Sequence, residues 1–254
     1  MRKLLLLLLA PLAAQAQMQV PDYNWLGAGV RARPAYDGSA AKETELIPSI
    51  RYFGGPWFAR TTQGMLEGGA RLEVTRDLHL GAQLAYEVGR KSSEAVFLAS
   101  RNVPDIDPGV SLGVHAEWDA HIGPAPTTLL ARLRRLVESD RGAQADLRYT
   151  VGVFGMGPVS AALFFQGTWA SAKSNQSYYG VSNDVSATTG LPAYSPGGGL
   201  LYTTGGVLYG IDIGTKWMII GNLEARRLQG AAARSPLVEQ PTSRYASASL
   251  AYKF

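Results

Sequence analysis

The stretch LHLGAQLAYEV, residues 78–88, alternates between apolar and polar side chains from one residue to the next. Neighbouring side chains of a β-strand point to opposite faces, so one face of such a strand is apolar and the other is polar. The apolar face carries Leu78, Leu80, Ala82, Leu84, Tyr86 and Val88, and the polar face carries His79, Gly81, Gln83 and Glu87. About ten residues of this pattern predict a strand that crosses a membrane within a β-barrel.

The same pattern recurs along the chain, for example in GVSLGVHAEWDAHI (109–122), QADLRYTVGV (144–153) and KWMIIGNLEARR (216–227). No apolar stretch reaches the length of about 20 residues that a transmembrane helix needs. We therefore expect an all-β fold, a transmembrane antiparallel up-and-down β-barrel of about twelve strands. The expected strands are residues 25–36, 43–53, 56–63, 65–76, 78–89, 109–122, 125–138, 143–154, 158–171, 200–213, 215–228 and 243–254.

The connections between these strands fall into two classes of length. On one side they are a few residues long, at 54–56, 76–77, 123–126, 155–158 and 214, whereas the other side includes the long segments 90–108, 172–199 and 229–242. Outer-membrane barrels have short periplasmic turns and long extracellular loops, so the lengths favour a membrane barrel over a soluble sandwich. The stretch QGMLEGG (63–69) fits either an outer turn or a bend, which leaves the strand count open between residues 56 and 76.

The composition agrees with an outer surface that faces lipid. Of 254 residues, 46% are hydrophobic and 17% are charged, whereas charges make up about a quarter of a typical soluble protein. The formal net charge of +4 is too small to point to a nucleic-acid partner. Cysteine is absent, which excludes disulfides and every metal site or nucleophile that is based on a thiolate.

The first residues, MRKLLLLLLAPLAAQAQ, have the layout of a secretory signal peptide. Arg2 and Lys3 precede an apolar run, and the segment 14–16 offers small residues for cleavage. We expect residues 1–16 to be removed and residues 17–254 to form the outer-membrane β-barrel. The expected location is the outer membrane of a Gram-negative bacterium.

The last residues, RYASASLAYKF (244–254), also alternate and end on an aromatic side chain. Leu250, Tyr252 and Phe254 share one face, which points to lipid if the last strand closes against the first. This pattern resembles the C-terminal signal by which the barrel assembly machinery recognises outer-membrane barrels. We expect these three residues to form that signal, and we expect the assembly machinery, outer-membrane lipid and lipopolysaccharide to be partners.

Charged side chains on the polar faces of two neighbouring strands predict a network inside the barrel. His115, Glu117 and Asp119 lie on one strand, and Arg132 and Arg134 lie on the next. A turn at 123–126 places Glu117 beside Arg132 and His115 beside Arg134, or shifts both pairings by two residues. We interpret the network as structural, because a narrow barrel must pair its interior polar groups with one another or with water.

No catalytic site, metal site or cofactor is expected. The chain has three histidines, His79, His115 and His121, and it shows no cluster of the kind that activates a nucleophile or a water molecule. A catalytic or metal role for His115 and His121 is the minor alternative. The glycines at 197–199 lack the lysine and the helix of a phosphate-binding loop.

The long connection 172–199 is the expected functional element outside the wall. It contains KSNQSYYGVSNDVSATTGLPAYSPGG (173–198), which is rich in turn residues and tyrosines. The candidate recognition residues are Gln176, Tyr178, Tyr179 and Tyr194. Such a loop recognises a partner or folds inward to constrict the lumen. In the alternative the three tyrosines pack among the other loops as a cover, since tyrosine both recognises and packs.

Five separated blocks of sequence carry a resemblance to a known family. They are WLGAGVRARPAYDGS (25–39), DIDPGVSLGV (105–114), QSYYGVS (176–182), SATTGLPAYSPGGGL (186–200) and RSPLVEQ (234–240). In this order, from about Trp25 to Phe254, the chain resembles the MipA/OmpV family of outer-membrane proteins. The resemblance implies an outer-membrane barrel. Through the member that names the family, it also implies a scaffold for murein hydrolase and synthase, with a membrane-bound lytic transglycosylase as a partner.

Two classes of function follow from these observations. The resemblance implies a non-enzymatic scaffold or binding protein whose periplasmic turns contact cell-wall enzymes. The polar lumen favours a narrow pore or small-solute channel instead, and the outer loops also suit an adhesin. The short inner turns count against a scaffold, because a stable interface needs about 800 Å² on each partner. Opposed charges that fill the lumen count against a channel, so a conductance measurement separates the two classes.

Overall fold

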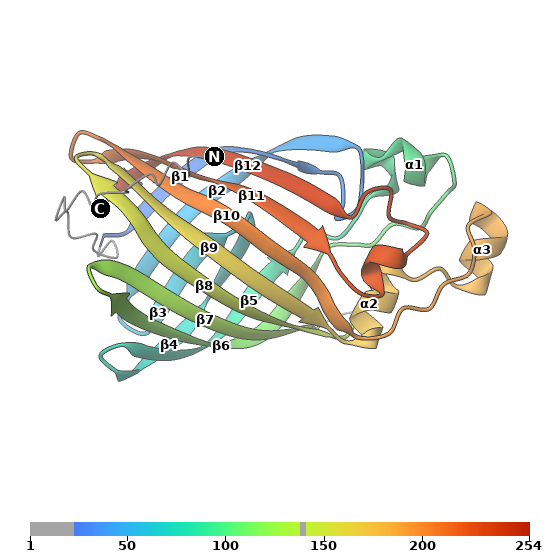
Figure 1. Ribbon diagram of the computed structural model, residues 1–254, viewed down its shortest axis with the longest axis horizontal. Helices are drawn as coiled ribbons and strands as arrows, with labels where there is room; N and C mark the ends of the chain where they lie inside the picture. The colour runs from blue at the N-terminus through green and yellow to red at the C-terminus, as the bar shows by residue number, and fades with distance from the viewer. Residues whose placement is uncertain (1–22, 138–140) are drawn as a thin grey trace, which may run out of the picture.

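Twelve strands close into one antiparallel barrel in the computed structural model, which describes residues 23–137 and 141–254 (Figure 1). Each strand pairs with its neighbours in the chain, and the last pairs with the first. The strands are β1 (Trp25–Pro34), β2 (Lys42–Gly54), β3 (Trp57–Thr62), β4 (Met65–Thr75), β5 (Leu78–Glu87), β6 (Gly109–Ile122), β7 (Ala125–Leu136), β8 (Ala143–Met156), β9 (Val159–Ala170), β10 (Gly199–Ile213), β11 (Trp217–Leu228) and β12 (Thr242–Lys253). The predicted all-β up-and-down barrel is confirmed, and every predicted strand end agrees to within about two residues. The predicted signal peptide lies outside the described residues.

The first and last strands close the barrel with a regular register. Their pairing runs from Trp25 opposite Lys253 to Ala32 opposite Ala246. Beyond it, the backbone groups of Asn24 and Phe254 exchange two hydrogen bonds, of 3.2 and 3.0 Å. Closure leaves neither strand with a free edge at this seam, which removes the template for aggregation that an edge would present.

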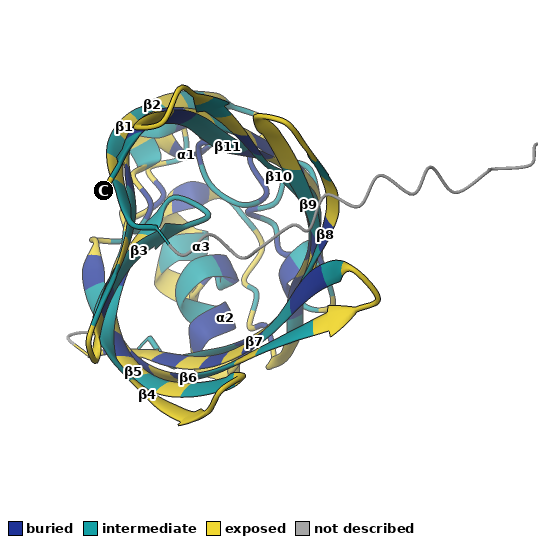
Figure 2. Cartoon of the chain, turned by 90° about the vertical axis from the view of Figure 1, so that its left-hand side faces the viewer, coloured by how far each residue is buried: buried dark blue, intermediate teal, exposed yellow. Residues whose placement is uncertain are grey.

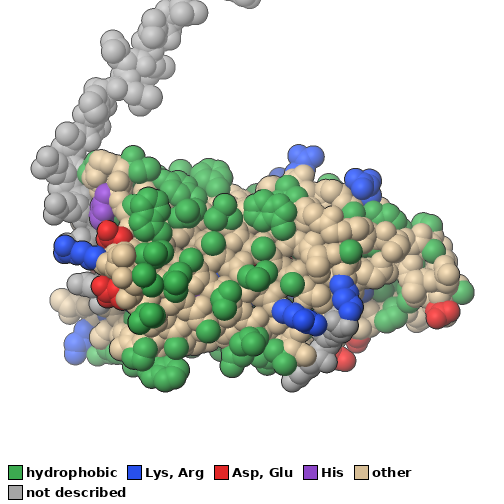
Figure 3. Space-filling model, turned by 90° about the horizontal axis from the view of Figure 1, so that it is seen from below, with side chains coloured by type: hydrophobic (Ala, Val, Ile, Leu, Met, Phe, Trp, Pro, Cys, Tyr) green, Lys and Arg blue, Asp and Glu red, His purple; other side chains and the backbone are tan. Residues whose placement is uncertain are grey.

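The outer face of the wall is apolar. Leucine, valine, phenylalanine and tryptophan side chains point outward at alternate positions, and Leu26, Leu72, Leu84, Val114 and Phe165 are each about half exposed or more. In Figure 3, hydrophobic side chains spread over the wall, while charged ones gather at the end with the short turns and toward the end with the loops. At the turn end, the rings of Trp217 and Tyr252 meet edge to face with centroids 5.2 Å apart. Such aromatic side chains are typical of the membrane interface.

The long connections carry the helices and form a cap at one end of the barrel. The 3₁₀ turn η1 (Ser92–Glu94) and helix α1 (Val96–Ala99) follow β5, helices α2 (Ala172–Tyr179) and α3 (Asn183–Thr189) follow β9, and the 3₁₀ turn η2 (Ala232–Arg234) follows β11. A small apolar core joins these connections to the β1–β2 loop, and its buried members are Ala35, Ala95, Leu98, Val103, Val181 and Leu237. The loops therefore form a packed layer over the barrel end (Figure 1). No helix in the described parts of the chain is long and apolar enough to cross a membrane.

The β3–β4 hairpin leaves the wall and folds into the lumen. β3 pairs with β2 only from Arg51 to Gly54, although β2 begins at Lys42. Gln63 and Gly64 form the turn, both with positive φ, and Figure 2 shows a hairpin loop beside β3 inside the barrel. A Cβ at position 64 would strike the guanidinium of Arg31, so this tip requires glycine. The sequence predicted a turn or a bend here and missed the inward fold.

Candidate functional site

A buried carboxylate inside the lumen ties the hairpin to strands farther along the wall. Glu67 of β4 accepts hydrogen bonds from Arg60 at 2.5 Å, Gln83 at 2.8 Å, and Thr62 and Arg132 at 2.9 Å. Arg132 belongs to β7, so its bond to Glu67 spans the inner face of β5 and β6, which lie between the two strands. A buried carboxylate is tolerated when charged donors surround it in this way.

A second carboxylate, Asp146 of β8, lies beside the first. Its Oδ2 atom is 3.3 Å from a terminal nitrogen of both Arg132 and Arg134, and its Oδ1 accepts from Thr168 at 2.6 Å. Arg134 also forms an ion pair with Glu87, with a nitrogen–oxygen distance of 2.7 Å. Acids and arginines therefore alternate across this side of the lumen. We call Glu67, Arg132, Asp146 and Arg134 the ion-pair layer.

The hairpin tip fills the other half of the cross-section. Gln63 donates a hydrogen bond of 3.1 Å to Glu224 of β11, and Asn222 donates to the same carboxylate at 3.0 Å. The guanidinium of Arg148 lies 4.0 Å from the ring centroid of Phe164. Side chains from both halves of the wall thus meet in the middle of the barrel.

The lumen is closed to water at this level. The side chains of Glu67, Asp146 and Glu224 have no exposed surface, and Phe164 is fully buried. A continuous aqueous channel would leave accessible surface on the side chains that line it. The ion-pair layer and the hairpin tip therefore close the barrel between its two ends.

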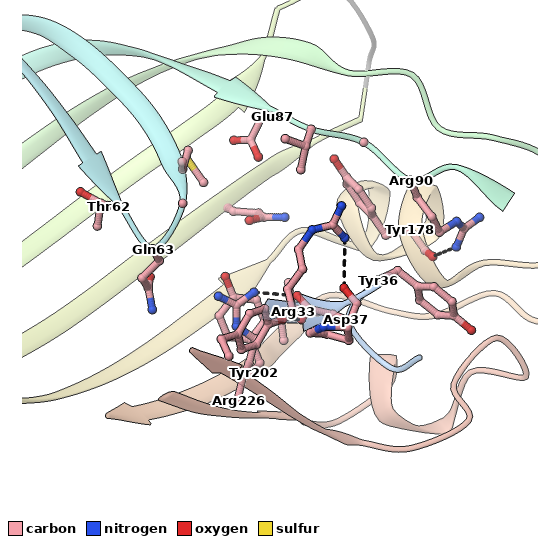
Figure 4. Close-up of a pocket in the computed structure, with 18 of the residues that line it drawn as sticks. Arg33, Tyr36, Asp37, Thr62, Gln63, Glu87, Arg90, Tyr178, Tyr202 and Arg226 are labelled. Atoms are coloured by element: carbon pink, nitrogen blue, oxygen red, sulfur yellow. Dashed lines mark hydrogen bonds and ion pairs between the residues drawn. The ribbon is translucent and has the colours of Figure 1, made fainter. Parts of the chain in front are cut away.

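A cavity of about 200 Å³ lies between the ion-pair layer and the loops. We call this cavity the vestibule. The charged residues that line it are Arg31, Arg33, Arg90, Arg132, Arg134, Arg226, Asp37, Glu45 and Glu87. In Figure 4, Gln63 stands at the hairpin tip on one side, and Arg90 lies beside Tyr178 on the other. Arginines thus outnumber carboxylates in the lining.

Most of the vestibule arginines are held by partners. Arg226 binds Asp37 at 2.7 Å and lies 4.4 Å from the ring centroid of Tyr202. Arg33 binds Glu45 at 2.8 Å. Arg90, in the β5–β6 connection, donates to the carbonyl of Tyr178 at 2.8 Å, and burial lowers its pKa. These contacts fix the shape of the lining.

The predicted lumen residues all lie on the inner side of β6 and β7, but their pairing differs in part. The register places His115 opposite Arg132 and Glu117 opposite Leu130, which is the predicted alternative shifted by two residues. Glu117 forms its ion pair with Arg60 at 2.7 Å, so of the two registers left open, the one that pairs Glu117 with Arg132 is not the one observed.

The remaining predicted lumen residues also have other partners. Asp119 accepts from Thr128 at 2.7 Å, and the ring of His115 meets that of Phe58 edge to face, with centroids 5.2 Å apart. Glu67 and Asp146, which hold the arginines, were missed. Both lie on inward positions of β4 and β8, so alternation alone contained the signal.

The candidate loop residues pack within the cap. Tyr179 is 7% exposed, and burial raises its pKa well above the ordinary value. The hydroxyl of Tyr194 donates to the carbonyl of Ala231 at 2.8 Å, and Gln176 accepts from Ser195 at 3.1 Å. Tyr178 lines the vestibule. These contacts match the packed cover that the sequence left open as an alternative.

The residues of the proposed C-terminal signal lie where the strand pattern put them. Leu250 and Phe254 are 50% and 60% exposed on the outer face, and Tyr252 contacts Trp217. Within the described residues, no group of three or more His, Asp or Glu side chains is arranged to hold a metal ion.

Comparison with known proteins gives a family and a fold. The family model of MltA-interacting protein MipA matches residues 26–254. A solved outer membrane channel from Pseudomonas putida aligns with a TM-score of 0.52 at 10% identity, covering 94% of this chain and 98% of that one. The NanC porin aligns with a TM-score of 0.49 at 12% identity, covering 91% of this chain and 100% of that one. No curated protein sequence matches significantly.

Proposed function

This chain belongs to the MltA-interacting protein MipA family of outer-membrane barrels, and from that premise we propose that it is a non-enzymatic binding protein with a closed lumen. The observation that carries the proposal is the ion-pair layer, where Glu67 and Asp146 have no exposed side-chain surface. A porin needs a hydrated path through its lumen. In this barrel, two buried carboxylates that are ion-paired with Arg132 occupy the lumen where such a path would run.

The proposed partner is a murein transglycosylase on the periplasmic side. The family description names an interaction with MltA. The two ends of this barrel differ in the surface that is accessible to a partner protein. The loop end is capped, whereas the turn end presents exposed cations such as Arg76 and Lys216 on short turns. No single turn supplies the roughly 800 Å² of a stable interface, so the partner is expected to contact several turns together.

Binding of a purified membrane-bound lytic transglycosylase to the reconstituted barrel tests this proposal. The variant Arg76→Glu/Lys216→Glu reverses two charges at the turn end and should weaken binding. The matched control, Lys91→Glu, reverses an exposed charge in the loop cap and should bind like wild type. Absence of binding by the wild type, or equal binding by both variants, would remove the support for a scaffold role.

A further inference from the structure

The wall of the barrel is incomplete beside the vestibule. The outer half of β2, from Lys42 to Ile50, pairs with β1, but within residues 23–137 and 141–254 no strand pairs with its other side. On the far side of this break, β5 extends past the last residue that β4 covers, because the β4–β5 register ends at Glu67 opposite Ala85. The break exists because the β3–β4 hairpin is short: it turns at Gln63 and Gly64, and its register with β2, if continued, would end at Thr62 opposite Ser49.

The sequence of β2 fits a strand edge without a partner. The backbone N–H of Ile50 points to the β3 side, where it donates to the hydroxyl of Thr61 at 3.3 Å. Backbone groups two residues apart in a strand point to the same side, so Pro48 would direct its N–H toward the break. Proline has no N–H, and an unpaired edge is where a strand tolerates it.

The vestibule reaches this break. Tyr86 and Val88 line the cavity, although 49% and 60% of their surface is exposed. Across the break, Leu46 of β2 is 85% exposed and Glu45 lines the cavity. Apolar side chains that suit lipid therefore lie where the cationic vestibule meets the break in strand pairing.

One arginine of the lining keeps its guanidinium without a hydrogen bond. Arg31 is 8% exposed, and its closest carboxylate oxygen, on Glu45, is 3.6 Å away. Among the described residues it donates no hydrogen bond, and its closest aromatic contact is the ring of Tyr245 at 4.9 Å. A buried cation without a hydrogen-bonded partner is costly, so an anionic group beside Arg31 would lower the free energy of the site.

We propose that the vestibule binds the anionic head group of a single-chain amphiphile that enters sideways from the outer leaflet, between β2 and β5. The head group, a carboxylate or a phosphate, accepts hydrogen bonds from Arg31, while the alkyl chain stays against Leu46, Tyr86 and Val88. The volume of about 200 Å³ is sufficient for a head group. The site lies at the opposite end from the turns, so it is independent of the proposed murein partner.

A fatty acid with a photoreactive diazirine close to its carboxylate tests the proposal in phosphatidylcholine vesicles that contain the protein. Cross-links in the wild type should map to the peptides that carry Glu45 and Glu87. Arg31→Gln should lower their yield about tenfold, the worth of a charge-assisted hydrogen bond. Arg31→Lys, which keeps the charge, should retain most of the yield.

Arg148→Gln is the matched control. Arg148 is 7% exposed, stacks on Phe164, donates no hydrogen bond among the described residues and does not line the vestibule. This variant should cross-link like wild type. Heat-modifiable migration on gels checks that each variant is folded.

Competition defines the ligand and remains informative if Arg31→Gln does not fold. Dodecyl phosphate should suppress the vestibule cross-links, whereas inorganic phosphate and dodecyltrimethylammonium at equal concentration should not. Full competition by inorganic phosphate would overturn the proposal in favour of a soluble-anion site. Equal competition by the cationic amphiphile, or cross-links spread evenly around the barrel wall, would also overturn it.

Discussion

Gln63 at the tip of the β3–β4 hairpin donates a hydrogen bond of 3.1 Å to Glu224, which lies on β11. The contact joins a strand near the start of the chain to one near its end, and it passes through the interior of the barrel. It places the tip of the hairpin inside the lumen, although β3 and β4 themselves remain part of the closed wall.

Loss of the central carboxylate should destabilise the barrel strongly. Glu67→Gln leaves the charges of Arg60 and Arg132 without their shared partner, which should cost about 3–5 kcal/mol of unfolding free energy. Glu73→Gln, an exposed position on the same strand, should change stability by less than about 0.5 kcal/mol. Guanidinium unfolding in lipid vesicles measures both, and similar values for the two variants would contradict the proposed role of Glu67.

A double-mutant cycle should identify the true partner of Glu117. Alanine substitutions of Arg60 and Glu117 should show a coupling of about 1–2 kcal/mol, because their charged groups are 2.7 Å apart. Asp119 and Arg132, which form no ion pair with each other among the described residues, should couple by less than about 0.5 kcal/mol. The reverse order of couplings would mean that the observed pairing is incorrect.

The loop that carries Asp105 should loosen in acid. Asp105 accepts two hydrogen bonds of 2.7 Å, from the backbone N–H and the hydroxyl of Ser92, and these hold its pKa below the ordinary 3.8. A carboxylate with a lowered pKa stabilises the folded state above its ordinary pKa and loses this effect as the pH falls through the folded value.

Hydrogen exchange of the Ser92 amide, corrected for its intrinsic rate, measures this change. Protection should stay constant from about pH 7 to 5 and fall below about pH 4. Asp105→Asn should reduce protection at neutral pH and flatten the pH dependence. Protection that rises as the pH falls would show the opposite sign and reject the explanation.

Replacement of the last aromatic side chain should affect assembly more than stability. Phe254→Ala keeps the backbone bonds to Asn24 but removes an exposed ring. If the ring belongs to the assembly signal, the amount of heat-modifiable protein in the outer membrane should fall, while the refolded variant should lose less than about 1 kcal/mol. Val153→Ala, another exposed position on the outer face, is the control. Equal amounts of assembled protein for both variants would exclude a signalling role for Phe254.

Alternation was sufficient to predict the wall because every membrane strand must separate an apolar face from a polar one. It failed at the β3–β4 tip for a reason that the residues there contain. The outward positions near the tip include Ala59, Thr61 and Gly68, which are small or polar, and Leu66 is the one large apolar side chain among them. At the other end of β4, Leu72 and Val74 are apolar and exposed. The change along one strand was the available sign that the tip leaves the wall.

Prediction of the ionic contacts required the strand register and the position of the hairpin tip, which an alternating pattern does not contain. Alternation places Arg132 and Glu117 on the inner face, but register and the inward hairpin decide that Arg132 meets Glu67. The loop helices were also missed, although Ser171 and Ser182 cap them by accepting from the backbone N–H groups of Ser174 and Val185. Ser171 was assigned to the end of the strand 158–171, and Ser182 was interpreted as a turn residue, which has the same local preferences as a cap.

The closed lumen is tested most directly by single-channel recording of the purified protein in a planar lipid bilayer. The wild type should add no current steps to those of the bare bilayer, and Glu67→Ala/Arg132→Ala, which removes the centre of the ion-pair layer, should produce them. Steady conductance of the wild type, with ion selectivity that shifts on Arg132→Ala at unchanged stability, would contradict the closed lumen and favour a porin.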